Sequence, residues 1–255
     1  MTFSDRFLAA LGGWQRGWRE DKDRRLVLAQ ELTAAVEAEG LSAKFQSSNA
    51  VCYRKRYLVP NNPQNGGDLG PLFLNGSVVE GLASWTTDKK FAQEFKDPLR
   101  EGTFAAVFAH RPSGGEVLAN IPELWSDPVF ESAVEAYSKR NGANADALLH
   151  FKFRQSEIVM NADLRLDELV ALCGKSSPFD VLCELGGLTT DVDRDDYWQR
   201  LVKDDKFPED PTWLTVEQTQ DVLQRTKRKF LEKHGCVIED VMERRSRDSF
   251  NGQAS

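Results

Sequence analysis

The sequence contains few of the residues that build metal centres. Of its 255 residues, four are cysteines and three are histidines. The cysteines stand alone, with no CxxC pair and no histidine at metal-ligand spacing, which argues against a zinc site. Isolated cysteines are typical of a reducing compartment, where they pack as small apolar side chains.

Long apolar runs are missing as well. No stretch approaches the length of a membrane-spanning helix. The apolar FLAAL segment near the N-terminus is too short, and too soon followed by Trp, Arg and acidic residues, for a signal peptide. We therefore expect a cytoplasmic protein. A net charge of -7 argues against extensive wrapping of nucleic acid but leaves room for a local basic site.

The pattern of apolar residues predicts an α+β protein with a β-rich centre flanked by helices. We expect an N-terminal helical segment (1–44), a core (45–170), a C-terminal helical extension (171–240) and a disordered tail (241–255). A helix is predicted over 19–39, ending at Gly40, and a loop over Pro60–Gly67. A T-x-x-Q capping box at Thr215 and Gln218 predicts the start of another helix.

Within the core, several segments have patterns that predict strands or helices. TFAAVFAH, GGEVLANI and LLHFKFRQSEIVM are predicted strands, and Pro128–Lys139 is a predicted helix. In TTDKKFAQEF, Thr87 or Asp88 is placed to cap a helix, because its side-chain oxygen can accept free amides of the first turn.

Two arginines share one face of the early strand that contains YRKR. Residues alternate between faces of a strand, so Arg54 and Arg56 point one way, and Tyr53 and Lys55 point the other. Paired arginines on a half-buried face need an anion, which phosphate supplies well. Alone, the pattern fits a solvated edge strand better.

A second candidate is SWTT, at the junction of a strand and a helix. Ser84, Thr86 and Thr87 offer hydroxyls, and Trp85 offers a flat apolar ring. Alone, this segment fits a capped helix with one core aromatic.

The third candidate is a carboxylate in the apolar strand FRQSEIVM. In a strand, Gln155 and Glu157 share a face about 6 to 7 Å apart. Burying a carboxylate is costly unless it is paired. Glu157 therefore lies either at a wet sheet margin or in a site.

Taken in order, these three segments resemble the ADP-ribosyltransferase superfamily, in its Arg–Ser–Glu branch with a Gln-x-Glu variant. The family pattern has an Arg on an early strand (YR), a Ser-Thr-Ser-type element before a helix (SWTTDKKFAQEF), and Glu/Gln-x-Glu on a late strand (QSE). The resemblance covers residues 45–165 and implies a split mixed or antiparallel β-sandwich with flanking helices.

The resemblance also implies roles for individual residues, with NAD as the substrate. Arg54, or else Arg56, would hold a phosphate of NAD. Ser84 would orient Glu157, which would bind the ribose 2′-hydroxyl and stabilise positive charge as nicotinamide leaves. Gln155 would orient the acceptor nucleophile.

The neighbouring Tyr53, Trp85 and Thr86 are further candidates for contact with NAD. Trp85 alternates with Ser84 and Thr86, so it is expected in the core, and the alternative places its ring against nicotinamide. Three positions depart from the family pattern: Lys55 stands where a small residue is usual, SWT replaces Ser-Thr-Ser, and Gln155 replaces Glu. Gln at that position is associated in the family with acceptors other than arginine.

The implied function is an NAD-dependent mono-ADP-ribosyltransferase that modifies a protein side chain or a nucleic acid. One alternative is an NAD glycohydrolase on the same fold, and another is a non-catalytic interaction protein. Family members with unfamiliar flanking segments are often toxins or effectors, delivered into a target cell or held by an antitoxin-like partner. The basic runs Lys227–Lys229 and Arg244–Arg247 could contact phosphates, although solvated helix faces explain them better.

Overall fold

The computed structural model describes residues 3–17, 22–59, 67–96, 103–140, 142–152, 155–174, 176–204, 206 and 212–232. The chain divides into two compact units, Met1–Cys173 and Gly174–Ser255. The N-terminal helices and the β-rich centre belong to the same unit.

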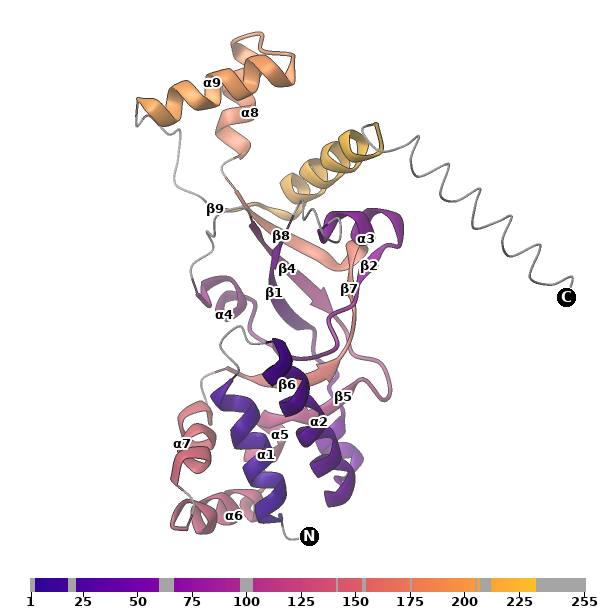
Figure 1. Ribbon diagram of the computed structural model, residues 1–255, viewed down its shortest axis with the longest axis vertical. Helices are drawn as coiled ribbons and strands as arrows, with labels where there is room; N and C mark the ends of the chain where they lie inside the picture. The colour runs from indigo at the N-terminus through magenta and orange to yellow at the C-terminus, as the bar shows by residue number, and fades with distance from the viewer. Residues whose placement is uncertain are drawn as a thin grey trace, which may run out of the picture. The chain divides into compact units, whose positions relative to one another are not determined.

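The first unit is built on a six-stranded antiparallel sheet in the order β5–β6–β3–β1–β4–β8 (Figure 1). Its strands are β1 (Cys52–Leu58), β3 (Leu82–Thr86), β4 (Phe104–His110), β5 (Val117–Asn120), β6 (Glu157–Asn161) and β8 (Leu169–Gly174). A separate pair joins β2 (Ser77–Val78) and β7 (Leu164–Arg165). The predicted α+β class is confirmed at this level.

Helices cover the β5–β6 end of this sheet. The helices of the unit are α1 (Asp5–Arg16), α2 (Lys22–Glu39), α3 (Leu69–Leu74), α4 (Lys89–Glu94), α5 (Ile121–Trp125), α6 (Pro128–Ser138) and α7 (Gly142–Phe151), with 3₁₀ turns η1 (Ala43–Gln46) and η2 (Leu166–Glu168). Helices α1, α2, α5, α6 and α7 gather around β5 and β6 (Figure 1). The hydrophobic core lies among them, with Phe7, Leu11, Leu32, Phe130 and Leu148 fully buried.

The second unit contains α8 (Ser176–Leu185), α9 (Asp191–Lys203), β9 (Thr212–Trp213) and a helix over 216–232. That last helix begins with the predicted capping box. The Thr215 amide donates to the Gln218 side chain at 3.0 Å, and the Gln218 amide donates to the Thr215 hydroxyl at 3.3 Å. The sequence signature therefore marks the helix start correctly.

Most predicted elements of the core are confirmed. Helix α2 ends at Gly40, whose φ of +62° suits glycine. Helix α4 is capped by Asp88, whose carboxylate accepts the Phe91 amide at 3.0 Å. The predicted strands TFAAVFAH and GGEVLANI form β4 and β5, and Pro128 opens α6.

The predicted strand LLHFKFRQSEIVM is wrong in its first part. Residues Leu148 to Phe151 end helix α7, and β6 begins only at Glu157. Short apolar runs do not distinguish a strand from a buried helix. Here Ala145 and Leu148, one helical turn apart, are fully buried, so the run packs as a helix.

Some expectations fall outside the described residues. These are residues 60–66 of the predicted loop, the basic run near Arg244, and the tail 241–255.

Helices α1 and α7 approach each other closely at Gly12. A Cβ added there would lie 2.3 Å from the Asn144 backbone oxygen. At the neighbouring Gly13, a Cβ would meet only Leu28 at 3.6 Å and the Asn144 side chain at 4.0 Å. Close packing therefore requires glycine at Gly12 but not at Gly13.

We expect Gly12→Ala to lower the free energy of unfolding by about 1–3 kcal/mol, because α7 must move to make room. Gly13→Ala is the matched control and should be neutral, or stabilising by up to about 1 kcal/mol, because alanine favours helix. Urea denaturation of both variants measures the difference. Equal stability of Gly12→Ala and the unmodified chain would contradict this close approach.

Candidate active site

Ser84 and Glu157 lie side by side although 73 residues separate them. They belong to the neighbouring antiparallel strands β3 and β6, in which Thr86 pairs with Glu157 and Ser84 pairs with Val159. Residues two apart on a strand share a face, so Ser84 is a diagonal neighbour of Glu157. The Ser84 hydroxyl donates to Glu157 Oε1 at 2.5 Å.

The last turn of α1 covers this pair. Gln15 Nε2 donates to Glu157 Oε2 at 2.8 Å, and Trp14 Nε1 donates to Ser84 Oγ at 3.0 Å. Both oxygens of the carboxylate thus hold a hydrogen bond, and Glu157 is only 4% exposed. Its charge is stabilised by directed donors rather than by bulk water.

Arg54 connects this pair to an arginine cluster. Its Nη1 donates to the Ser84 backbone oxygen at 2.8 Å, and its Nη2 donates to Glu80 Oε1 at 2.7 Å. Arg56 donates to the other Glu80 oxygen at 2.7 Å. Arg54 and Arg56 therefore share a face as predicted, and the anion they meet is a carboxylate of the chain itself.

Glu80 is the centre of that cluster. Its side chain is fully buried, and Arg25 of α2 also reaches it, at 3.2 Å. Burial alone would raise the pKa of Glu80, but attraction to Arg54, Arg56 and Arg25 outweighs this effect and holds its pKa below the ordinary value of 4.5.

Most of the charged groups in the described part of this cluster are basic. Its three guanidiniums face two carboxylates, Glu80 and Asp68, the latter 3.8 Å from Arg56. The side chains of Arg54 and Arg56 stay 22% and 30% exposed. Part of each side chain is thus open to solvent, and within the described part of the chain the buried Arg54 Nε has no hydrogen-bond partner.

The other predicted site residues of β1 and β3 lie elsewhere. Trp85 is buried in the core with its ring 5.8 Å from His110, which favours the core interpretation over a ring against nicotinamide. The Thr86 hydroxyl donates to the Gln155 backbone oxygen at 2.5 Å, a contact that joins β3 to the start of β6. Tyr53 shares a strand face with Lys55, which donates to carbonyls at the end of α4.

Gln155 does not lie on a strand. It sits in a bend before Ser156, whose φ of +42° is unusual for a residue with a side chain. The expectation that Gln155 and Glu157 share a strand face is therefore wrong. Gln155 instead immediately precedes the sharp turn that leads into Glu157.

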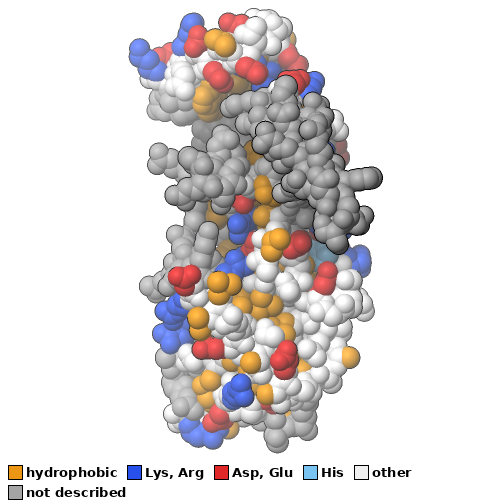
Figure 2. All heavy atoms as spheres, turned by 45° about the vertical axis from the view of Figure 1, so that its right-hand side comes forward, with side chains coloured by type: hydrophobic (Ala, Val, Ile, Leu, Met, Phe, Trp, Pro, Cys, Tyr) orange, Lys and Arg blue, Asp and Glu red, His pale blue; other side chains and the backbone are white. Residues whose placement is uncertain are grey.

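Away from the Ser84–Glu157 pair and the arginine cluster around Glu80, basic and acidic side chains lie close to one another. Basic and acidic side chains are interspersed over the face drawn in Figure 2. In the second unit, Lys229 pairs with Asp191 at 2.5 Å, and Arg228 lies 3.9 Å from Glu232, as expected for a solvated helix face. Among the described residues, no cluster of His, Cys, Asp or Glu suits a metal ion, and no helix is long and apolar enough to cross a bilayer.

Comparisons with protein-family models, with curated proteins and with solved structures found no match to this chain. The site must therefore be judged on its own geometry.

Four residues of the site escaped the sequence analysis: Trp14, Gln15, Arg25 and Glu80. For Glu80 a signal was present, because it is a lone carboxylate in the apolar segment SVVEGLAS, the same pattern that drew attention to Glu157. Trp14 and Gln15 carried no such signal, since a helix residue that reaches a distant strand has no local pattern.

We expect Glu80→Gln to lower the free energy of unfolding at pH 7 by about 3 kcal/mol, because three guanidiniums lose their buried counter-charge. Since the folded pKa of Glu80 is depressed, its stabilisation is present above pH 4.5 and is lost as the pH falls through the folded value. The gap between variant and unmodified chain should therefore narrow in acid.

Urea denaturation from pH 7 down to pH 3 measures this gap. Glu123→Gln is the matched control, because Glu123 is an exposed carboxylate 3.8 Å from Lys44, and it should change stability by under about 0.5 kcal/mol. A gap that is small at pH 7, or that widens in acid, would show that Glu80 does not hold the cluster.

Proposed function

We propose that this chain is an NAD-dependent mono-ADP-ribosyltransferase with Glu157 as its catalytic carboxylate. The observation that carries the proposal is the 2.5 Å hydrogen bond between Ser84 and Glu157, with Arg54 bound to the backbone of the same serine. An arginine, a serine and a late carboxylate from three strands thus form one connected group. This is the grouping that the sequence resemblance implies.

Glu157 suits a reaction in which positive charge develops on a sugar. The bond between ribose C1′ and the nicotinamide nitrogen breaks, and its electron pair neutralises the departing pyridinium. The carboxylate accepts a hydrogen bond from the ribose 2′-hydroxyl and stabilises the oxocarbenium-like transition state. An acceptor nucleophile then bonds to C1′ and releases its proton to water.

The arginine cluster supplies the phosphate site. The side chains of Arg54 and Arg56 are 22% and 30% exposed, which supports the approach of a phosphate from solvent. Glu80 fixes both guanidiniums on the same strand face. A guanidinium that is already held in position loses less conformational entropy on binding an anion than a mobile side chain does.

Gln155 is the candidate for orienting the acceptor, because it stands two residues before Glu157 and is only partly buried. If no macromolecular acceptor is used, water takes its place and the chain is an NAD glycohydrolase. A non-catalytic interaction protein is the third possibility, and it predicts no release of nicotinamide.

Access to Glu157 requires movement of the last turn of α1. Earlier residues of α1, such as Phe7 and Leu11, are fully buried, so the body of the helix is anchored. Its last turn is joined to the site by side-chain hydrogen bonds and ends at Gly17, with φ of +79°. Gln15 Oε1 is buried and has no hydrogen-bond partner among the described residues, which weakens this closed arrangement. We therefore assign Gln15 as a cover over Glu157.

The first test removes the carboxylate. The intact chain is incubated with labelled NAD and a cell lysate, and nicotinamide release is followed with the label on protein, RNA and DNA. Glu157→Gln should lower release on the order of a hundredfold, because it removes one charge at a cationic transition state. The exposed Glu123→Gln serves as the control and should retain full activity.

Each result has a distinct meaning. Full turnover by Glu157→Gln would overturn the catalytic assignment. Nicotinamide release without label on any polymer would select the glycohydrolase, and no release from the unmodified chain would favour the interaction protein.

The second test removes the cover. Gln15→Ala should lower the KM for NAD by several-fold and leave kcat within about twofold, because substrate no longer displaces the Gln15 side chain. Steady-state nicotinamide release gives both constants. A fall in kcat with an unchanged KM would instead place Gln15 in the catalytic machinery.

A further inference from the structure

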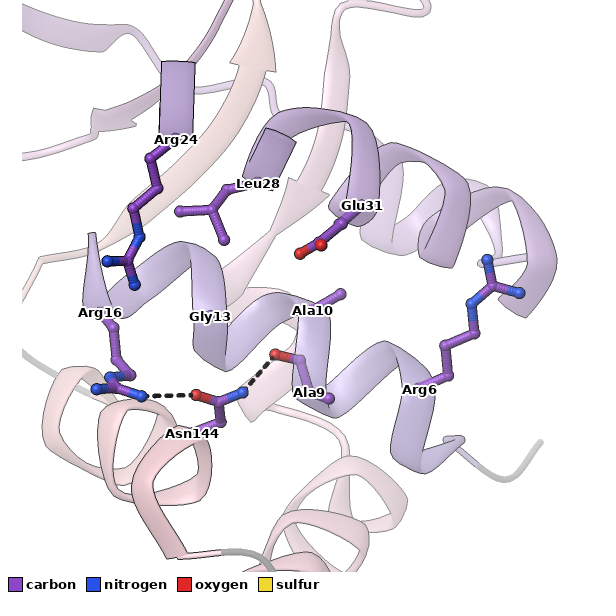
Figure 3. A pocket seen from close by; sticks show the side chains of 9 residues that line it. All are labelled: Arg6, Ala9, Ala10, Gly13, Arg16, Arg24, Leu28, Glu31 and Asn144. Atoms are coloured by element: carbon purple, nitrogen blue, oxygen red, sulfur yellow. Dashed lines mark hydrogen bonds between the residues drawn. The ribbon is translucent and has the colours of Figure 1, made fainter. Parts of the chain in front are cut away.

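A groove of about 510 Å³ lies on the other side of α1, between α1 and α2 (Figure 3). Trp14 and Gln15 point from α1 to Ser84 and Glu157, whereas Gly13 and Arg16, beside them in the chain, line the groove. The groove is thus separate from the candidate active site, and its volume is typical of pockets that bind small molecules.

The floor of the groove is small and apolar. Ala9, Ala10 and Gly13 of α1 face Leu28 of α2. A methyl group at Gly13 would make only ordinary contacts, so packing does not require glycine there. The sequence has glycine at this position although a methyl group would fit, which leaves room for the flat apolar body of a ligand.

The rim of the groove is basic. Arg16 and Arg24 lie at one end, and Arg6 lies at the other (Figure 3). Ten helical residues separate Arg6 from Arg16, about 15 Å along the axis. Only one acidic side chain, Glu31, is among the described residues that line the groove. Three arginines thus line the groove, although the net charge of the whole chain is -7.

Arg16 is held in position by Asn144 of α7. Its Nη1 donates to Asn144 Oδ1 at 3.3 Å, and Asn144 Nδ2 donates to the Ala9 backbone oxygen at 3.1 Å (Figure 3). The asparagine thereby ties the Arg16 guanidinium to the groove wall through Nη1. The N–H groups on the other two nitrogens of Arg16 remain as hydrogen-bond donors for a ligand. A positioned guanidinium matches the oxygens of a phosphate through two parallel hydrogen bonds.

We infer that the groove binds a phosphate-bearing small molecule of mononucleotide size. The phosphate lies between Arg16 and Arg24, and the apolar body rests on the floor formed by Ala9, Ala10, Gly13 and Leu28. The Glu31 carboxylate accepts a hydroxyl or amino hydrogen of the ligand. This inference does not rest on the proposed reaction with NAD.

Calorimetric titration of the intact chain with AMP tests this inference. AMP carries a phosphate dianion, a flat base and sugar hydroxyls, so it should bind measurably. Adenosine lacks the phosphate and inorganic phosphate lacks the body, and each should bind at least tenfold more weakly. The inference would be overturned if adenosine or inorganic phosphate bound as tightly as AMP, or if AMP did not bind.

Variants locate the site. Arg16→Ala and Arg24→Ala should each weaken AMP binding on the order of tenfold, as expected for loss of a charged hydrogen bond. Arg165→Ala is the matched control, because it removes the same charge from an exposed position paired with Asp167. It should bind AMP unchanged.

Glu157→Gln should also leave AMP binding unchanged, because Glu157 does not line the groove. Wild-type affinity in Arg16→Ala and Arg24→Ala, or loss of affinity in Glu157→Gln, would place AMP outside the groove and overturn the inference.

Discussion

A single buried carboxylate holds the centre of the first unit together. Glu80 accepts hydrogen bonds from guanidiniums of α2 and β1, and Arg54 extends the connection to the backbone of β3. A buried charge with partners on several elements is costly to separate from any of them, so it fixes their relative positions. The positions of Arg54 and Ser84 relative to each other depend on this constraint.

The second determinant of the site is the end of α1. Ser84 and Glu157 meet because β3 and β6 are neighbours in the sheet, but Trp14 and Gln15 complete their hydrogen bonds. The same helix therefore stabilises the carboxylate and shields it from solvent. The proposed reaction also needs access for NAD, which this cover opposes. Gln15 Oε1 has no hydrogen-bond partner among the described residues, so the Gln15 side chain is the part of the cover that we expect to move.

Local patterns predicted the local features of this fold, and tertiary contacts decided the rest. Asp88 as a cap, the alternation of Arg54 and Arg56, and the burial of Trp85 follow from rules that span a few residues. The helix at LLHF could not be predicted, because its burial against other helices outweighs its strand-like composition. The sequence pattern predicted that a ligand would supply the anion that Arg54 and Arg56 bind. In the structure Glu80, 24 residues from Arg56, supplies that negative charge from within the chain.

The hydrogen bond between Ser84 and Glu157 joins β3 to the buried carboxylate, and a double-mutant cycle measures its strength. Ser84→Ala, Glu157→Gln and the double variant are unfolded in urea, and the interaction energy is the departure of their effects from additivity. We expect a coupling of about 1 kcal/mol or more, the size typical of a hydrogen bond to a buried charge. Additive effects of the two substitutions would show that the serine and the carboxylate do not meet.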